Sequence, residues 1–210
     1  NYYGSYYGKM TIDKAVQLSN NTIPVRICRE LTPQKSFDFL TKKLGITTLV
    51  EKEKIDGKIF SDINLSGMAL GGVTKGVKVL ELAGAYQIYA NGGYFTKPYS
   101  YTKILDNKGN LILEKDVTPK SVISPDTAMI MNQLLQRVIN GPQGTGRAAK
   151  FGSLPLAGKT GSTTDDKDLW FVGMSPYYIG VVWYGYDEPK QVKYGRYPTP
   201  IIWKNVMEPL

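Results

Sequence analysis

Histidine is absent from all 210 residues, and cysteine occurs once, as Cys28. The lack of histidine excludes a Ser-His-Asp triad, a Cys-His pair and any histidine-ligated metal. A single cysteine excludes an internal disulfide and a cysteine-cluster metal site. Cys28 follows the largely apolar segment 23–27, so we interpret it as a core residue. Any general base must therefore be a lysine, a carboxylate or a tyrosine, and we expect neither a metal nor a cofactor.

The sequence also lacks an apolar run long enough to cross a bilayer, a signal peptide and an initiating methionine. It opens on Asn1-Tyr2-Tyr3-Gly4, so we interpret it as a piece of a longer chain. Its length and apolar content allow one large domain with a substantial core. The net charge of +8 favours anionic surroundings such as lipid, cell-wall polymer or nucleic acid. Because no nucleic-acid motif is visible, we expect no nucleic-acid partner.

Caps, chain breakers and apolar spacing divide the chain into predicted helices and strands. Helices are expected at residues 12–18, from Thr32-Pro33 to Gly45, at 76–90, at 127–139 and from Thr199-Pro200 onward. Strands are expected around Lys159, at 169–174 and 178–184, and in a hairpin of 99–105 with 110–113. Helix 76–90 is apolar around most of its circumference and is expected to be central and buried. Residues 1–8 are expected to be irregular and residues 46–76 to be loop-rich. The pattern predicts an α+β (mixed α/β) fold, with helices on both sides of a mostly antiparallel sheet.

The segment Leu156-Ala157-Gly158-Lys159-Thr160-Gly161-Ser162-Thr163-Thr164 is the strongest local pattern. Leu154 and Leu156 alternate with smaller residues, as in an extended segment, and 169–174 offers an antiparallel partner. The glycines beside Lys159-Thr160 let a ligand approach the backbone closely. A cation, hydroxyls and free backbone N–H groups at a sheet edge suit a ligand that has a carboxylate and an extended backbone.

Without histidine, serine chemistry needs a lysine as proton acceptor. The corresponding motif set is Ser-x-x-Lys, then Ser-Asp-Asn or a variant, then Lys-Thr-Gly. Ser19-Asn20-Asn21 supplies a Ser-x-Asn at a predicted helix end, and Lys159-Thr160-Gly161 follows 140 residues later. A Ser-x-Asn by itself is typical of a turn. The two motifs in this order indicate a catalytic site.

Three other patterns have structural interpretations that we prefer. Ser100-Tyr101-Thr102-Lys103 is the one literal Ser-x-x-Lys, but it lies on a predicted strand, where positions i and i+3 point to opposite faces. Gly144-Thr145-Gly146 follows a predicted helix instead of a strand and lacks the lysine-serine ending of a phosphate loop. The acidic cluster of Asp165, Asp166 and Asp168 lies in a predicted turn beside Lys167, where we expect solvated charge instead of a metal site.

At this point the chain resembles the transpeptidase domain of class A penicillin-binding proteins, the bifunctional peptidoglycan synthases. The resemblance extends along nearly all 210 residues and rests on a series of segments: 11–21, Leu70-Gly71-Gly72, 80–86, Ala90-Asn91-Gly92-Gly93, Gly144-Thr145-Gly146, Gly158-Lys159-Thr160-Gly161, Asp168-Leu169-Trp170-Phe171-Val172-Gly173 and Trp183-Tyr184-Gly185-Tyr186. The resemblance implies a fold like that of penicillin-binding-protein transpeptidases and serine β-lactamases. Residues 1–210 would be a partial domain, lacking the Ser-x-x-Lys segment and an upstream glycosyltransferase domain.

The resemblance also implies roles for individual residues. Ser19 would relay a proton to the leaving amine, and Asn21 would bind the substrate backbone. Lys159 would supply positive potential near Ser19 and the terminal carboxylate. In the substrate-binding strand that includes Gly161, Thr160 and Ser162 would offer hydroxyls to that carboxylate, and the Ser162 N–H would be one oxyanion donor. The family more often has threonine at position 162. The nucleophile itself is absent from this chain.

The expected activity is D,D-transpeptidation of peptidoglycan stem peptides by serine acyl transfer, with covalent inhibition by β-lactams. Partners would be stem peptides ending in D-Ala-D-Ala, β-lactam antibiotics and the N-terminal half of the same domain. The location would be the extracytoplasmic face of a bacterial membrane, reached through a missing N-terminal anchor. A non-catalytic β-lactam receptor or scaffold, a D-alanine carboxypeptidase and a β-lactamase remain alternatives.

Overall fold

The computed structural model describes residues 7–210, so the expectation for residues 1–6 lies outside the described part. The helical elements are α1 (Ile12–Gln17), α2 (Thr22–Leu31), α3 (Pro33–Asp38), the π-helical turn η1 (Phe39–Lys43), α4 (Leu65–Leu70), α5 (Val79–Tyr86), η2 (Gln87–Tyr89), α6 (Pro125–Asn140), η3 (Arg147–Ala149), η4 (Thr164–Asp166) and α7 (Pro198–Met207). The strands are β1 (Glu53–Ile55), β2 (Lys58–Phe60), β3 (Tyr94–Phe95), β4 (Lys103–Leu105), β5 (Leu111–Glu114), β6 (Lys120–Ser121), β7 (Ala157–Ser162), β8 (Asp168–Met174) and β9 (Ile179–Gly185).

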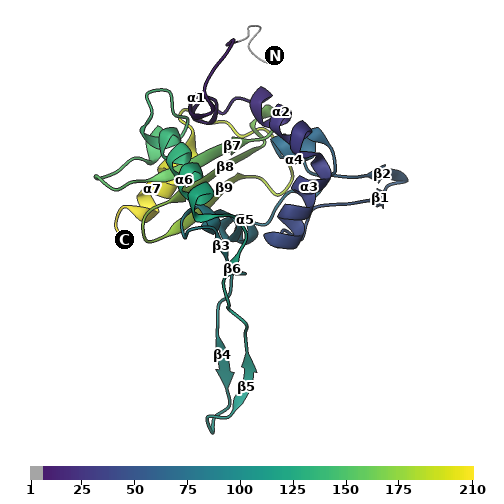
Figure 1. Cartoon of the computed structure of the whole chain (residues 1–210), viewed down its shortest axis with the longest axis vertical. Helices are drawn as coiled ribbons and strands as arrows, with labels where there is room; N and C mark the ends of the chain where they lie inside the picture. Colours follow the sequence, from purple (N-terminus) through teal and green to yellow (C-terminus); the bar gives the residue numbers. More distant parts are fainter. Residues whose placement is uncertain (1–6) are drawn as a thin grey trace.

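The body is organised around a three-stranded antiparallel sheet with the order β7-β8-β9 (Figure 1). Lys159 lies opposite Val172, and Gly161 lies opposite Trp170, so all four residues belong to the same face. Trp170 in turn lies opposite Trp183 on β9. The predicted strand at Lys159 and its antiparallel partner are therefore confirmed.

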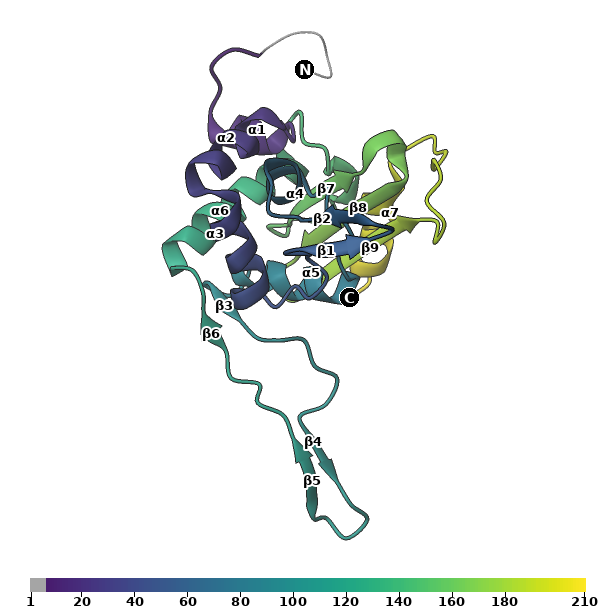
Figure 2. The ribbon, with the colours of Figure 1, turned by 90° about the vertical axis from the view of Figure 1, so that its right-hand side faces the viewer.

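Helix α7 covers the opposite face of this sheet (Figure 2). Its Trp203 is buried and packs edge-on against Phe171, with ring centroids 5.6 Å apart. Gly173 and Gly180 make room for the indole, because a Cβ on Gly173 would lie 2.3 Å from Trp203 Cε2. The glycine of the Trp-Phe-Val-Gly segment is thus a packing requirement of the sheet.

We expect Gly173→Ala to destabilise the domain by about 3 kcal/mol, because overpacking against a buried ring forces the helix away from the sheet. Urea unfolding followed by circular dichroism measures this change. Gly161→Ala is the matched control for stability, since its Cβ would lie 3.5 Å from Trp170 Cβ, an ordinary contact. Equal stability of the two variants would contradict this account of Gly173.

Helices α5 and α6 cover one end of the Lys159 face. Leu135 of α6 packs in a buried cluster with Ala157 and Met174, and Tyr86 and Ile179 lie at its edge. The expected arrangement of helices on both sides of an antiparallel sheet is confirmed. Burial of Cys28 confirms its interpretation as a core residue.

Three sequence-based expectations were wrong in detail. Residues 46–76 contain the β1–β2 hairpin and helix α4. The helix expected at 76–90 begins at Val79, and Leu80 is 64% exposed, so α5 is not buried all round. Leu154 is exposed and precedes β7 instead of lying in it.

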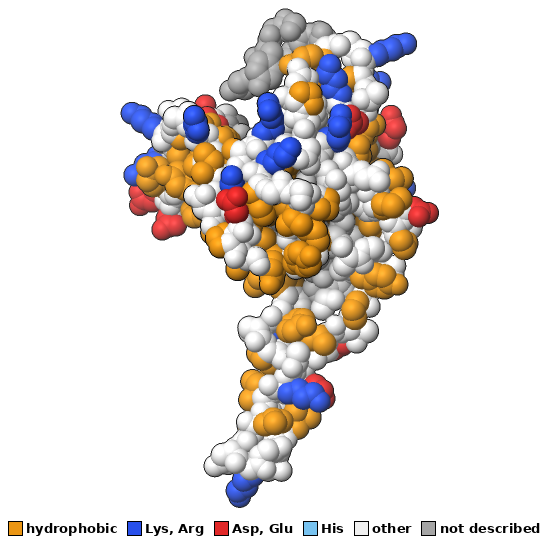
Figure 3. All heavy atoms as spheres, turned by 90° about the vertical axis from the view of Figure 1, so that its left-hand side faces the viewer, with side chains coloured by type: hydrophobic (Ala, Val, Ile, Leu, Met, Phe, Trp, Pro, Cys, Tyr) orange, Lys and Arg blue, Asp and Glu red, His pale blue; other side chains and the backbone are white. Residues whose placement is uncertain are grey.

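A long arm made of residues 96–119 projects from the body (Figures 1 and 2). At its base, β3 pairs with β6, with Tyr94 opposite Ser121, and at its far end β4 pairs with β5. The strand expected from residue 99 begins only at Lys103. Apolar side chains on both strands of the arm lie exposed (Figure 3), including Leu105 at 54% and Ile112 at 65%.

Candidate active site

The two motifs that lie 140 residues apart in the sequence meet through one hydrogen bond. Lys159 Nζ donates to Ser19 Oγ at 2.6 Å, and a second hydrogen bond of 2.8 Å joins it to the carbonyl of Thr160. A lysine ammonium within hydrogen-bond distance of a serine hydroxyl is an arrangement that can transfer a proton. The predicted pairing of Ser19 with Lys159 therefore exists in the folded chain.

Ser19 is held in place by the end of α1 and the start of α2. The Thr11 side chain caps α1 by accepting a hydrogen bond from the Lys14 N–H. Ser19 itself has φ of 53°, in the left-handed region that non-glycine residues rarely adopt. Asn20 Oδ1 then accepts hydrogen bonds from the N–H and hydroxyl of Thr22 at 2.9 and 2.6 Å, and so caps α2. The turn between two capped helices thus fixes the serine backbone.

Helix α6 anchors α1 from behind. Arg137 Nε forms an ion pair with Asp13 Oδ1 at 3.0 Å. The buried side chain of Gln17 fills the space beside Gly141, where a Cβ would lie only 1.7 Å from Gln17 Nε2. This packing places the C-terminal end of α1, and therefore Ser19, beside β7.

Asn21, the third residue of the motif, lies exposed just before α2. Among the hydrogen bonds of residues 7–210, none joins its side chain to Ser19 or Lys159. Asn20, and not Asn21, provides the side-chain cap of α2. The structure thus brings Ser19 and Lys159 into contact, whereas Asn21 lies exposed two residues after Ser19.

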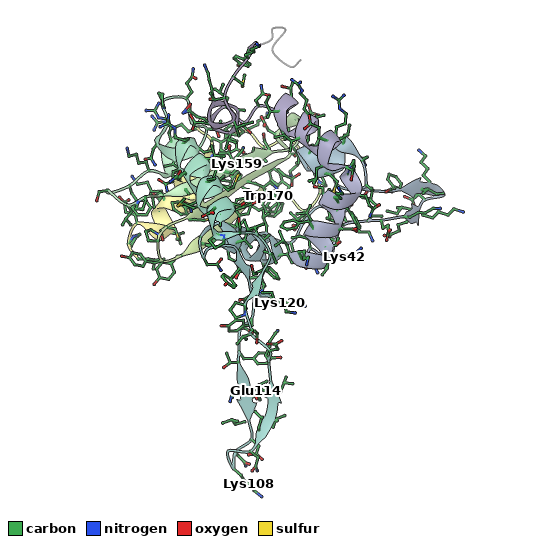
Figure 4. All side chains as sticks on the ribbon, in the orientation of Figure 1. Lys42, Lys108, Glu114, Lys120, Lys159 and Trp170 are labelled. Carbon is green, nitrogen blue, oxygen red and sulfur yellow. The ribbon has the colours of Figure 1, made fainter. Side chains whose placement is uncertain are left out.

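Burial lowers the pKa of the Lys159 ammonium from 10.5 to about 8. Lys159 points from β7 on the face that also carries Val172 and Trp170, and Figure 4 shows Lys159 and Trp170 near each other at the centre of the body. Trp170 packs against Trp183 at 6.3 Å between ring centroids. At pH 7 most molecules therefore carry the charged Lys159 ammonium, and a minor fraction carries the neutral amine.

The lowered pKa predicts how stability changes with pH. Between about pH 8 and 10.5 the unfolded chain still holds the Lys159 proton, whereas the folded chain has released it. Below pH 8 the folded protein bears the full cost of burying the ammonium. As the pH rises from 8 to 10.5 this cost disappears, so the free energy of unfolding increases by up to about 3 kcal/mol. Urea unfolding at pH 7.5 and pH 10 should show that Lys159→Met is the more stable protein at pH 7.5. The difference should narrow at pH 10, and a difference independent of pH would contradict the assignment.

The end of β7 is held by two residues whose roles sequence reasoning missed. Thr145 and Thr160 share a hydrogen bond of 2.6 Å between their hydroxyls. The Tyr197 hydroxyl donates to the carbonyl of Gly161 at 2.5 Å. Burial raises the pKa of Tyr197 to about 12, so this phenol stays protonated and remains a donor. Thr145 lies in the Gly-Thr-Gly segment noted in the sequence, whereas no local signal identifies Tyr197.

Tyr197→Phe should destabilise the domain by about 1 kcal/mol, because the Gly161 carbonyl then loses its hydrogen-bond donor. Thermal unfolding at pH 7 measures the loss. Tyr177→Phe removes a hydroxyl from a side chain that is 76% exposed and should leave the midpoint unchanged. If the two variants unfold alike, the Tyr197 hydrogen bond contributes nothing to holding β7.

Two members of the acidic cluster, Asp166 and Asp168, form hydrogen bonds with neighbouring side chains. Asp168 accepts a hydrogen bond from Trp183 Nε1 at 2.9 Å and another from the Thr163 hydroxyl, and Tyr194 binds Asp166. The expectation of merely solvated charge was therefore wrong for Asp168. Within the part of the chain that the structure describes, no group of three or more metal-ligating side chains gathers.

Ser100 and Lys103 do not form a catalytic pair. Ser100 precedes β4, so the argument from opposite strand faces does not apply as stated. Lys103 instead forms an ion pair with Glu114 across the arm, with 2.9 Å between Nζ and Oε1. Figure 4 shows Glu114 far out on the arm, away from Lys159. We therefore still reject Ser100 and Lys103 as a catalytic pair, because Lys103 is paired with Glu114 on the arm and not because the two side chains point to opposite faces of a strand.

Comparison with known proteins identifies the family to which this chain belongs. Residues 1–208 match the family model of the penicillin binding protein transpeptidase domain. The chain belongs to this family, and the resemblance seen in its sequence motifs is confirmed. Among residues 7–210, no helix is both long and apolar enough to span a membrane.

Curated relatives that this chain matches over nearly its whole length are penicillin-binding proteins. The chain is 36% identical over 210 residues to penicillin-binding protein 1A of Clostridium tetani, covering 96% of this chain and 26% of that protein. It is 32% identical over 210 residues to penicillin-binding protein 4 of Bacillus subtilis, covering 99% of this chain and 32% of that protein. The chain thus spans about a quarter to a third of the length of these relatives.

Solved structures agree with the fold. The penicillin-binding protein PonA1 from Mycobacterium tuberculosis has a TM-score of 0.76 at 25% identity, covering 99% of this chain and 58% of that one. Penicillin-binding protein 1A from Haemophilus influenzae has a TM-score of 0.72, covering 96% of this chain and 34% of that one. At 21% identity, the second likeness supports the fold alone.

Proposed function

We propose that residues 1–210 form the C-terminal part of a serine-type D,D-transpeptidase domain that cross-links peptidoglycan stem peptides and is acylated by β-lactams. The observation that carries this proposal is the hydrogen bond between Lys159 and Ser19, formed beside the Lys-Thr-Gly strand of a penicillin-binding-protein fold. Thr160 and Ser162 follow Lys159 on that strand, at the position where an extended substrate with a terminal carboxylate would lie.

The nucleophile in this proposal is the serine of a Ser-x-x-Lys segment outside residues 1–210. Its hydroxyl attacks the carbonyl between two D-alanines while the lysine of the same segment accepts the proton. The C–N bond breaks as the ester forms, and D-alanine leaves as an amine that receives its proton through Ser19. The amine of a second stem peptide then attacks the ester, forms the cross-link and restores the serine hydroxyl.

The described residues supply the other functions. Lys159 shares a proton with Ser19 and adds positive potential for the substrate carboxylate, which binds the hydroxyls of Thr160 and Ser162. The Ser162 N–H is one oxyanion donor, and Asn21 binds the substrate backbone. Exposed apolar side chains on α2 and α5, among them Ile27 at 51% and Leu80 at 64%, support the presence of a further segment that covers them.

The place of action that follows is the extracytoplasmic side of a bacterial membrane, with anchorage through a segment outside this chain. The names of the relatives support a penicillin-binding protein of class A type. Two alternatives keep the same fold: a β-lactam-binding receptor without turnover, and a D-alanine carboxypeptidase that transfers the acyl group to water.

Fluorescent penicillin tests the proposal. The complete protein is labelled and digested, and the modified serine is located by mass spectrometry, while the 210-residue chain alone is treated in parallel. We expect the label on a Ser-x-x-Lys serine outside residues 1–210 and no label on the isolated chain. Label on Ser19 would overturn the assignment and make Ser19 and Lys159 a nucleophile and base.

Product analysis separates the alternatives. With a D-Ala-D-Ala peptide and an amine acceptor, the proposed transpeptidase yields a new amide and free D-alanine. A carboxypeptidase would release D-alanine without the new amide, and a receptor would become labelled by penicillin but release no D-alanine.

A further inference from the structure

A second concave site lies on the α7 side of β7. This open pocket, which we name the rear pocket, has a volume of about 490 Å³. Its polar and charged lining residues are Thr145, Arg196, Tyr197, Lys204 and Asn205, and Ala148, Pro200 and Ile201 form an apolar part of its wall. Cavities of this size hold small organic ligands. Its lining comes from Thr145 in the loop before η3, from η3, from the segment before α7 and from α7 itself. It is separate from the Lys159–Ser19 pair, because α7 covers the opposite face of the sheet.

The charges of the rear pocket favour a dianion. Arg196 and Lys204 bring two cations to it, and none of its lining residues carries a carboxylate. The nearby Glu208 contacts Lys204 only at 3.7 Å, with both side chains partly exposed, which is a weak ion pair. The hydroxyl of Thr145 and the amide of Asn205 add hydrogen-bond donors, whereas the single Tyr197 hydroxyl hydrogen is already given to the Gly161 carbonyl. Two cations with several neutral donors match a phosphate group better than a carboxylate, which has a single charge.

Two lining residues bind directly to the Lys-Thr-Gly strand. Thr145 hydrogen-bonds to Thr160 through their hydroxyls, and Tyr197 donates to the Gly161 carbonyl. A threonine hydroxyl has one hydrogen to donate. If a phosphate in the rear pocket accepts the Thr145 hydrogen, Thr145 can only accept from Thr160. The Thr160 hydroxyl then donates its hydrogen to Thr145 and can no longer donate it to a ligand on the substrate side.

We propose that the rear pocket binds a phosphate group and that its occupancy weakens substrate binding at Thr160. The pocket and the active site compete for the hydroxyl hydrogens of Thr145 and Thr160, so the coupling is negative and reciprocal. The effect on substrate rests on the proposed function, whereas the binding of phosphate does not.

Calorimetry and amide NMR test binding. Inorganic phosphate and glycerol phosphate are titrated into the protein at constant ionic strength, with chloride as the blank for screening. Arg196→Gln and Lys204→Gln should each weaken binding at least about fivefold, since each removes a charge-assisted contact. Lys108→Gln is the matched control, because it also removes one positive charge but lies at the tip of the arm (Figure 4). It should leave phosphate binding unchanged. Tighter binding of glycerol phosphate would identify an organic phosphate ester as the ligand, and equal binding would identify free phosphate.

Penicillin acylation of the complete protein tests the coupling. Saturating phosphate should lower the acylation rate constant about fivefold. Thr145→Val should keep phosphate binding through Arg196 and Lys204 but remove this inhibition. No saturable binding, or binding unaffected by both charge variants, would overturn the proposal. Binding without any change in acylation would overturn the coupling, while a protein that binds phosphate but takes no penicillin would instead refute the proposed function.

Discussion

Lys159→Met is expected to lower the rate constant of β-lactam acylation in the complete protein by at least about 1,000-fold. The change removes the donor to Ser19 Oγ at 2.6 Å and the positive potential beside Thr160 and Ser162. It also removes a group whose pKa near 8 allows it to hold or release a proton close to neutral pH. Stopped-flow or quenched labelling with fluorescent penicillin measures the rate constant.

Two substitutions of Lys159 distinguish the contribution of its positive charge from that of proton transfer. Methionine keeps the apolar stem of Lys159, so the β7 strand and its neighbours should remain folded. Lys159→Arg keeps the positive charge, but arginine does not release its proton at neutral pH. Recovery of carboxylate binding without recovery of acylation in Lys159→Arg would indicate proton transfer as the main role. Acylation of Lys159→Met at the unaltered rate would remove Lys159 from the mechanism.

Ser19→Ala should lower acylation about 100- to 1,000-fold and leave the fold intact. The alanine cannot relay a proton to the leaving group, a contribution typical of general acid–base catalysis. It also leaves the Lys159 ammonium without its serine partner, so the pH dependence of the residual rate should change shape. The measurement is the acylation rate between pH 6 and pH 10.

Ser100→Ala is the matched control for this variant. Ser100 belongs to the literal Ser-x-x-Lys of the chain, yet Lys103 of that segment is paired with Glu114 on the arm. We expect its acylation to be unchanged across the same pH range. Loss of labelling in Ser100→Ala together with full labelling of Ser19→Ala would reverse the assignment of the two serines.

The sequence predicted the parts of the fold that local chemistry determines. The helix expected at 12–18 is α1, and the helix expected at 127–139 is α6. Each begins after a residue whose hydroxyl caps it, Thr11 and Ser124 respectively. The Lys159 strand and its antiparallel partner were also predictable, because turn and apolar pattern agree there. The pairing of Ser19 with Lys159 was predictable only from the order of two motifs and the family resemblance.

Long-range hydrogen bonds account for what sequence reasoning missed. The buried carboxylate of Asp62 accepts hydrogen bonds from the N–H groups of Val50 and Thr74, both at 2.8 Å. These contacts organise a segment that its glycines had suggested was a loop. Tyr197 binds Gly161 from 36 positions away, so no local periodicity could indicate it.

The pairing at the base of the arm has a consequence for how this domain can change. Because Tyr94 lies opposite Ser121, the chain leaves the body and returns to it at almost the same point. The intervening residues could be shortened, extended or exchanged, and the two-strand junction would remain closed with little rearrangement of the body. The arm is therefore a module that evolution or engineering can vary in length while the sheet around Lys159 keeps its geometry.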